Sequence, residues 1–359
     1  MADLEIRERV PLAPFTTLGV GGEARWLVEG GDEATVAAAC DWARTHGAPM
    51  LVLGGGSNVV ISDAGVDALV LRIALRGIEV RETGRDTELI VAAGEPWDEL
   101  VQMTVERSWA GFECLSGIPG LVGATPIQNV GAYGQEVAET VVAVRVLDTR
   151  DSRIRTFTST DCRFGYRDSV FKSGEPHRYV VLAVTYRLRA GGAPTVRYAD
   201  VERDLATRGI PRPSLDDVRR SIIAIRRSKS MVIDGGDPNR RSCGSFFVNP
   251  VVAAADAAGV AARAGSDRMP QWPERDGRVK LSAAWLIEHA GFHRGYAAGR
   301  AGLSSRHTLA IVAHDGATAD DVVTLARRIQ TDVEARFGVQ LTPEPEYWET
   351  PKKFPARVS

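Results

Sequence analysis

The chain has 359 residues, with 46 acidic and 44 basic side chains and a formal net charge of −2, a length that predicts two or three domains. This charge balance excludes a generic nucleic-acid-binding protein. No apolar run reaches the ~18 residues of a membrane-spanning helix, and the charged start MADLEIRERV does not resemble a signal peptide, so we expect no membrane insertion. The four cysteines, Cys40, Cys114, Cys162 and Cys243, form no CxxC pair, which argues against a zinc site or a disulfide framework and favours a reducing cytoplasm.

The first 75 residues predict strands around one helix, with a phosphate-binding turn. Asp32 is a suitable N-cap for a helix over Glu33–Thr45, because its side chain can accept from the first free N–H groups. Short strands at Met50–Leu53 and Val59–Ile61 flank the sequence GGGSN at 54–58. Bare N–H groups after a strand can converge on an anion, although GGGSN lacks the Gly-Lys-Ser/Thr ending of a P-loop.

A second glycine pattern, at Gly19, Gly21 and Ala24, matches the GxGxxG/A fingerprint of Rossmann folds. That fingerprint requires a strand before it and a helix after it. Here prolines precede the pattern and the strand-like residues 25–29 follow it. The sequence therefore argues against a Rossmann dinucleotide site.

The rest of the chain predicts mixed helices and strands. In the middle segment, 78–82 and 88–92 favour paired strands, and Pro96 precedes a helix at 97–107. We further expect strands at 141–147, 154–157 and 180–188, and helices at 198–208 and Leu215–Ser228. The last third predicts helices at 252–264, 282–290 and Ala319–Phe337, and a strand at 308–312. Capping boxes mark the starts of two helices, at Ser214 and Thr318.

Residues 115–137, LSGIPGLVGATPIQNVGAYGQEV, are the most informative stretch. Five glycines break helix and strand periodicity, and they allow the backbone to approach a ligand closely. A glycine-rich linker is the alternative, but linkers are polar, whereas this stretch keeps apolar anchors such as Ile118, Leu121 and Val130. Two glycine-rich segments about sixty residues apart fit an elongated dinucleotide such as FAD.

Other candidate chemistry is weaker. His289 and His293 have helical metal-binding spacing but no HExxH pattern, so we interpret them as structural or surface histidines and predict no metal site. Ser245 lacks the GxSxG context of a hydrolase. Cys243 is interpreted as a packed side chain.

Five motifs in order, LGGGSN, SGIPGLVGATPIQNVGAYGQEV, FGYRDSVFK, GSFFVNP and PEPE, resemble the UDP-N-acetylenolpyruvoylglucosamine reductase family. The resemblance covers Thr16 to about Glu344. It implies a flavoenzyme with noncovalent FAD that uses NADPH to reduce UDP-N-acetylglucosamine-enolpyruvate to UDP-N-acetylmuramate for peptidoglycan. We correspondingly expect the protein to be a cytoplasmic monomer and to bind no nucleic acid. The segment around Tyr198 looks like the longer form of the family, in which a tyrosine loop closes over the uridine nucleotide.

The implied fold class is α+β, with a vanillyl-alcohol-oxidase-like (PCMH-type) FAD-binding fold in two subdomains and a C-terminal α+β substrate-binding domain. The expected boundaries are 1–75 for the first FAD-binding subdomain, joined by the tail 346–359, then 76–228 for the second and 229–345 for the substrate domain.

The resemblance also implies roles for individual residues. Arg167 would contact the enolpyruvyl carboxylate, Ser245 would donate a proton, and Glu344 would assist it, with Glu346 as a competing carboxylate. The expected cofactor-binding residues are Gly54, Gly55, Gly56, Ser57, Asn58, Gly117, Gly120, Gly123, Thr125, Gln128, Asn129, Gly131, Ala132 and Tyr133. The expected substrate-binding residues are Tyr198, Lys229, Asn249 and Lys280.

Two other classes of function remain as alternatives. An FAD-dependent oxidase of the same fold would react rapidly with oxygen and would not need NADPH. A flavin- or nucleotide-binding regulatory protein would not need Arg167, Ser245 and Glu344 to converge.

Overall fold

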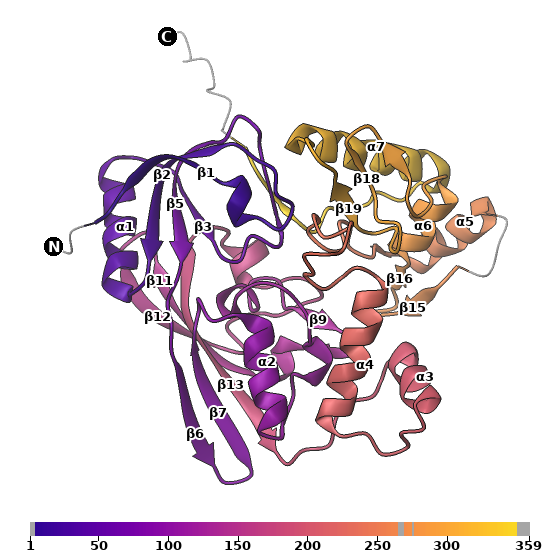
Figure 1. Ribbon diagram of the computed structural model, residues 1–359, viewed down its shortest axis with the longest axis horizontal. Coiled ribbons are helices and arrows are strands. Elements are labelled where there is room, and N and C mark those ends of the chain that lie inside the picture. The colour runs from indigo at the N-terminus through magenta and orange to yellow at the C-terminus, as the bar shows by residue number, and fades with distance from the viewer. Residues whose placement is uncertain (1–3, 265–268, 275, 350–359) are drawn as a thin grey trace. The chain divides into compact units, whose positions relative to one another are not determined.

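The computed structural model describes residues 4–264, 269–274 and 276–349 (Figure 1). Its contacts divide the chain into two compact units. Unit 1 comprises Met1–Val10, Ala24–Gly56 and Asp67–Ile233, and unit 2 comprises Pro11–Glu23, Ser57–Val66 and Asp234–Ser359. The chain therefore passes between the units several times, and the GGGSN turn lies at one of the crossings.

The first sheet, mainly in unit 1, has the strand order β1-β2-β5-β3. Its strands are Arg7–Pro11 (β1), Glu23–Gly30 (β2), Met50–Leu53 (β3) and Val66–Ile73 (β5). Helix α1, Glu33–Thr45, buries Val36 and Ala39 in a core shared with Leu69 and Leu71 of β5. Figure 1 shows α1 beside these strands.

The second sheet of unit 1 has the order β12-β11-β13-β7-β6, and β8 also pairs with β13. Its strands are Ile78–Thr83 (β6), Asp86–Ala92 (β7), Trp109–Ala110 (β8), Val141–Asp148 (β11), Arg153–Thr158 (β12) and Tyr179–Ala190 (β13). The remaining elements of unit 1 are helices Trp97–Glu106 (α2), Ala199–Thr207 (α3) and Leu215–Ser228 (α4), the hairpin Gly131–Ala132 (β9) and Gln135–Glu136 (β10), and short turns at Glu113–Leu115, Val122–Ala124, Val137–Glu139 and Val170–Gly174. One hydrophobic core joins both sheets, from Val28 to Leu188.

Unit 2 builds a separate core from helices and very short strands. Its elements are Val59–Ile61 (β4), Val251–Val252 (β14), Gln271–Pro273 (β15), Val279–Leu281 (β16), Ala297–Ala298 (β17), Ala301–Leu303 (β18), Ile311–Ala313 (β19), Glu346–Trp348 (β20), Ala254–Ala264 (α5), Ala283–His289 (α6) and Ala319–Phe337 (α7), with a short turn at Ala13–Phe15. Helix α7 packs Val322, Leu325 and Ile329 into this core. Strand β20 pairs in parallel with β4 and so ties the end of the described chain to residues 59–61.

The α+β fold class is confirmed, and most predicted elements are present. Helices α1, α4 and α7 have the predicted bounds, and the side chains of Asp32, Ser214 and Thr318 cap them as expected. Gly19 and Gly21 precede a strand, β2, and no helix, which agrees with the argument against a Rossmann site.

Two predicted elements begin two or more residues later than expected. The helix expected at 252–264 begins at Ala254, because Val251 and Val252 pair with β16 instead. The strand expected at 308–312 is Ile311–Ala313, since the chain at Ala310 turns back on His307.

The predicted domains stay a prediction. The two compact units group residues by contact, and they join 11–23 and 57–66 to the C-terminal part of the chain. The change at Ile233 lies five residues from the expected boundary at 228. Of the expected tail 346–359, residues 350–359 lie outside the described residues.

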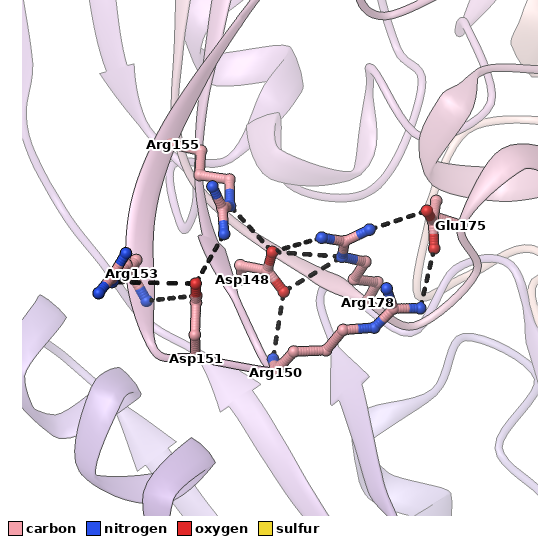
Figure 2. Close-up of polar contacts among 7 residues, drawn as sticks. All are labelled: Asp148, Arg150, Asp151, Arg153, Arg155, Glu175 and Arg178. Atoms are coloured by element: carbon pink, nitrogen blue, oxygen red, sulfur yellow. Dashed lines mark hydrogen bonds and ion pairs between the residues drawn. The ribbon is translucent and has the colours of Figure 1, made fainter.

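Asp148, at the end of β11, is a fully buried carboxylate between two arginines (Figure 2). Arg155 Nε and Arg178 Nη2 both donate to Asp148 Oδ2, at 2.9 and 2.8 Å. The backbone N–H of Arg150 donates to Asp148 Oδ1 at 3.1 Å. Burial opposes ionisation, but hydrogen bonds from Arg178, Arg150 and Arg155 outweigh it and lower the pKa of Asp148 to about 2. The network fastens the ends of β11, β12 and β13 together.

Replacing this carboxylate should cost stability in a pH-dependent way. Because the folded pKa of Asp148 lies below its ordinary value, its contribution is complete above about pH 4 and is lost as the pH falls toward about 2. Asp148→Asn should therefore lower the free energy of unfolding by about 2 kcal/mol near neutral pH. Denaturant unfolding at several pH values checks this, and a difference that does not shrink on acidification would contradict it.

Candidate functional site

The GGGSN turn and the glycine-rich loop, residues 115–137, lie backbone against backbone. A Cβ atom added at Gly55 would come within 2.8 Å of the Gly120 Cα, so a side chain here would push the two segments apart. Gly56 has a φ of +61°. Within the described part of the chain, the N–H groups of Gly55 and Gly56 donate no hydrogen bond, so they can receive an anion.

Other glycines of the loop serve internal packing. The Gly117 N–H donates to Asp98 Oδ1 at 2.6 Å, and the Gly123 N–H donates to the Ala93 oxygen at 2.9 Å. A Cβ at Gly123 would lie 2.6 Å from that of Ala93. The loop therefore uses these two N–H groups to hold its own shape.

Asp98 explains how the loop is fixed to helices α2 and α4. Arg219 donates to both Asp98 oxygens, at 2.6 and 3.0 Å, beside the Gly117 N–H. Burial opposes ionisation of Asp98, but these bonds outweigh it and hold the pKa of the carboxyl below its usual value. The ionised carboxylate thus orders the first turn of the loop.

The polar side chains of the loop are also engaged internally. Asn129 is 1% exposed, and its Nδ2 donates to Glu136 Oε2 at 2.8 Å and to the Gly165 oxygen at 2.9 Å, while its Oδ1 accepts from the Ala138 N–H at 3.1 Å. Thr125 Oγ1 lies 2.6 Å from the Tyr186 hydroxyl. Gln128 and Ala132 are partly buried in the same loop.

Tyr133 contacts Tyr198 and Arg226. Its backbone has a φ of +49°. The Tyr133 and Tyr198 rings pack edge to face with centroids 5.4 Å apart, and Tyr198 is the N-cap of α3 with 42% of its surface exposed. Near it, Lys229 Nζ forms an ion pair with Asp200 at 3.1 Å. The structure therefore brings the expected cofactor residue Tyr133 and the expected substrate residues Tyr198 and Lys229 to one region of unit 1.

Arg226 was missed by the sequence analysis. It is 7% exposed, its Nη2 donates to the Met231 oxygen at 2.6 Å, and its Nε is buried with no partner among the described residues. Burial lowers its pKa, against the effect of Tyr133 and Asp98. A signal was present, because Arg226 continues the apolar stripe of Leu215, Val218 and Ile222 on α4. A buried guanidinium with an unused donor beside the loop is suited to an anionic ligand.

Arg167 lies at the turn between Gly165 and Asp168 with a φ of +54°, a strained conformation that is frequent at functional sites. Its Nη2 donates to the Gly131 oxygen of the glycine-rich loop at 2.8 Å. The structure therefore brings Arg167 to the loop. The neighbouring Asp168 carboxylate accepts from Ser173 Oγ at 2.6 Å.

In unit 2, the segments that carry Ser245 and Glu344 lie side by side. Phe247 bridges Pro343, and the Glu344 N–H donates to the Phe246 oxygen at 2.9 Å. Asn58 of the GGGSN turn donates through Nδ2 to the Glu344 oxygen at 3.3 Å, and Ser57 is partly buried next to it. Glu344 also faces Cys243, whose pKa rises to about 12 through burial, the nearby Glu344 charge adding to the effect. The competing Glu346 is exposed on β20.

The last two expected substrate residues belong to neighbouring elements of unit 2. Asn249 Oδ1 accepts from the Ala283 N–H at the start of α6, at 3.0 Å. Lys280, on β16, places Nζ 2.7 Å from Glu274 Oε1. Arg167 and the loop belong to unit 1, whereas Ser245, Glu344, Asn249 and Lys280 belong to unit 2, so their convergence is part of the proposal below.

The four cysteines are buried, and His289 packs against an aromatic ring. All four cysteines are buried and unpaired, and burial raises the pKa of each thiol to about 12, which disfavours a thiolate nucleophile. His289 stacks on Trp285, with ring centroids 3.6 Å apart. Among the described residues, no cluster of three metal-binding side chains occurs, and no helix is long and apolar enough to cross a membrane.

Comparison with known proteins defines the class first. Residues 24–158 match a family model described as an FAD binding domain. The glycine turn, the close backbone contact at Gly120 and the unpartnered Arg226 Nε fit such a cofactor. The chain is therefore an FAD-binding protein of the PCMH-type α+β fold with a further C-terminal domain.

The C-terminal residues 237–348 match the C-terminal domain of UDP-N-acetylenolpyruvoylglucosamine reductase. A reductase of that name from Saccharopolyspora erythraea is 47% identical over 93% of this chain and 93% of its own length. One from Pseudomonas aeruginosa is 43% identical over 96% of this chain and 99% of its own. The crystal structure of the Thermus caldophilus enzyme covers 96% of this chain and all of that one, at 28% identity and a TM-score of 0.67. The chain belongs to the UDP-N-acetylenolpyruvoylglucosamine reductase family.

Proposed function

We propose that this protein uses NADPH and noncovalent FAD to reduce the enolpyruvyl group of UDP-N-acetylglucosamine-enolpyruvate, which yields UDP-N-acetylmuramate for peptidoglycan. The observation that carries the proposal is full-length similarity, 47% identity over 93% of the chain, to a reductase named for this substrate. The reaction would take place in the cytoplasm, and the protein would act as a monomer. Residues 1–75 and 76–228 would hold FAD, and 229–345 would bind the substrate.

The residues of this chain divide the chemistry among them. When bound and reduced by NADPH, the flavin would supply the hydride chemistry for the enolpyruvyl double bond. The Arg167 guanidinium contacts the substrate carboxylate and stabilises the negative charge that develops during the addition. Ser245 donates a proton to the α-carbon, and Glu344, rather than the exposed Glu346, assists it.

Other residues would bind the FAD and the uridine nucleotide. The N–H groups of Gly55 and Gly56 are suited to the FAD pyrophosphate, and Gly120 admits the two backbones close together. Tyr198, Lys229, Asn249 and Lys280 hold the uridine nucleotide, and the two lysines supply positive charge for its diphosphate.

The FAD is expected to be held without a covalent bond, because neither glycine-rich segment contains histidine and all four thiols are buried. Acid precipitation of the yellow protein should release the chromophore into the supernatant. Colour that stays with the precipitated chain would contradict this prediction.

Tyr198 is expected to act on the nucleotide rather than on NADPH, since it lies on the exposed N-cap of α3 and packs on Tyr133. Tyr198→Ala should raise the KM for the uridine nucleotide by about tenfold, the scale of one lost aromatic contact, and leave the KM for NADPH nearly unchanged. Tyr198→Phe keeps the ring and serves as the control. Equal increases for both substrates would contradict the assignment.

The proposed reaction itself is tested by its stoichiometry. Incubation with NADPH and the enolpyruvyl nucleotide should oxidise one NADPH for each nucleotide consumed, and the product mass should rise by two hydrogens. Turnover of a small alcohol with oxygen, without NADPH, would instead support the oxidase alternative.

A further inference from the structure

Glu113 is a buried carboxylate whose role neither the family motifs nor the reaction explains. It is 1% exposed, and among the described residues its side chain forms no ion pair. Its Oε1 accepts from the Thr195 N–H at 2.7 Å and from Gln135 Nε2 at 2.8 Å, and its Oε2 accepts from the Gly111 N–H at 2.8 Å. A buried carboxyl group is costly unless hydrogen bonds satisfy it, and these three bonds supply its partners.

The bonds converge on Thr195, three residues before Tyr198. All three polar groups of Thr195 are engaged: the N–H by Glu113, Oγ1 by Gln135 Nε2 at 3.1 Å, and the backbone oxygen by Cys114 Sγ at 3.2 Å. Gln135 is 3% exposed and also accepts from the Cys114 N–H at 2.8 Å. Thr195 is therefore fixed to the end of the glycine-rich loop.

Beyond Thr195 the contacts become weaker along the chain. Arg197 donates to the Gly134 oxygen at 3.2 Å, but 62% of its side chain is exposed. Tyr198 touches Tyr133 by its ring alone and is 42% exposed. Residues 195, 197 and 198 thus follow 135, 134 and 133 in antiparallel order, with every polar group of Thr195 bonded and the side chains of Arg197 and Tyr198 partly exposed. After Tyr198, helix α3 packs Val201 and Leu205 into a core with Cys114. Thr195 is therefore the fixed point on the N-terminal side of Tyr198.

We propose that Glu113 is a positioning residue for nucleotide binding: through Thr195 and Gln135 it anchors the segment that carries Tyr198 and keeps Tyr198 in register with Tyr133. The inference rests on the proposed function for its substrate. The anchor itself is a property of the chain and can be measured without turnover.

Glu113→Ala is the test, because it removes both carboxyl oxygens and therefore the bonds from Thr195, Gln135 and Gly111 together. In the FAD-loaded protein, hydrogen exchange in peptides covering Thr195 should become at least about tenfold faster, while α1 keeps its rate. Asp148→Asn removes another buried carboxylate of unit 1 and should leave exchange at Thr195 unchanged. Equal acceleration throughout unit 1 would overturn the proposal.

The proposal also predicts that losing the Glu113 carboxylate weakens nucleotide binding and spares flavin reduction. Glu113→Ala should raise the KM for the uridine nucleotide about fivefold and leave flavin reduction by NADPH within about twofold of the wild-type rate. Adding Tyr198→Ala should then raise the KM by less than in the wild-type background, since the two residues act through one segment. Independent, multiplicative effects would overturn the proposal, as would equal losses in both half-reactions.

Two further outcomes also decide the proposal: a variant that does not fold, and a protein that does not use the enolpyruvyl nucleotide. If Glu113→Ala does not fold, Thr195→Val, which removes only the Gln135 bond, should show the same pattern at about twofold, and the absence of that pattern would overturn the proposal. If the wild-type protein does not turn over the enolpyruvyl nucleotide while the exchange contrast at Thr195 holds, the proposed function fails and the anchor stands.

Discussion

Ser245→Ala should leave the first half-reaction intact and slow the second by about a hundredfold or more, the scale of a lost general acid. The proton that Ser245 donates is needed only after hydride has reached the flavin. The variant should therefore bind FAD and be reduced by NADPH at close to the normal rate. Reoxidation of its flavin by the enolpyruvyl nucleotide should be the step that slows, which anaerobic stopped-flow absorbance measures in two separate mixes.

Thr318→Ala is a matched control, because it also deletes a hydroxyl from unit 2. Thr318 caps α7, so its loss should cost about 1 kcal/mol of stability and change neither half-reaction. If Ser245→Ala slows both steps equally, the serine supports the fold or the flavin. If it slows neither, another group supplies the proton.

Arg167→Lys should reduce turnover by about a hundredfold or more, since an ammonium cannot reproduce two-point contact with a carboxylate. The measurement is the rate of flavin reoxidation by the nucleotide. Flavin reduction by NADPH should change much less. Arg145→Lys, which disturbs a two-point ion pair with Glu33 elsewhere in unit 1, is the control and should keep full turnover. A lysine variant at 167 with normal turnover and a lowered melting temperature would indicate a structural role.

The sequence predicted the long helices well because their signals are local. Capping residues and the 3.6-residue periodicity lie within the helix itself, as at Asp32 for α1 and Thr318 for α7. The short strands β14 to β19 have two or three residues each, too few for a periodic pattern. Their pairing is set by distant partners, as Val251 with Lys280 shows.

The candidate site was predictable in part. The motifs identified the glycine-rich loop and Arg167, and the structure brings them together through the Gly131 oxygen. The motifs did not reveal that Gly117 and Gly123 donate to Asp98 and Ala93. A close internal contact and a bound ligand both require a glycine at such a position, so the sequence alone does not distinguish between them.

Buried polar residues were the main omission. Glu113 and Gln135 precede and end the glycine-rich stretch, where they look like ordinary charged and polar loop residues. Their importance comes from contacts with Thr195, 82 and 60 residues away. Arg226 could have been found, because a charge on the apolar face of an amphipathic helix is itself a signal.

The central claim is tested most directly by the fate of the reduced flavin. The wild-type protein is first bleached anaerobically with one equivalent of NADPH and then mixed with either the enolpyruvyl nucleotide or oxygenated buffer. The account predicts that yellow colour returns rapidly and stoichiometrically with the nucleotide, and much more slowly with oxygen. Rapid return with oxygen and none with the nucleotide would contradict it and identify an oxidase instead.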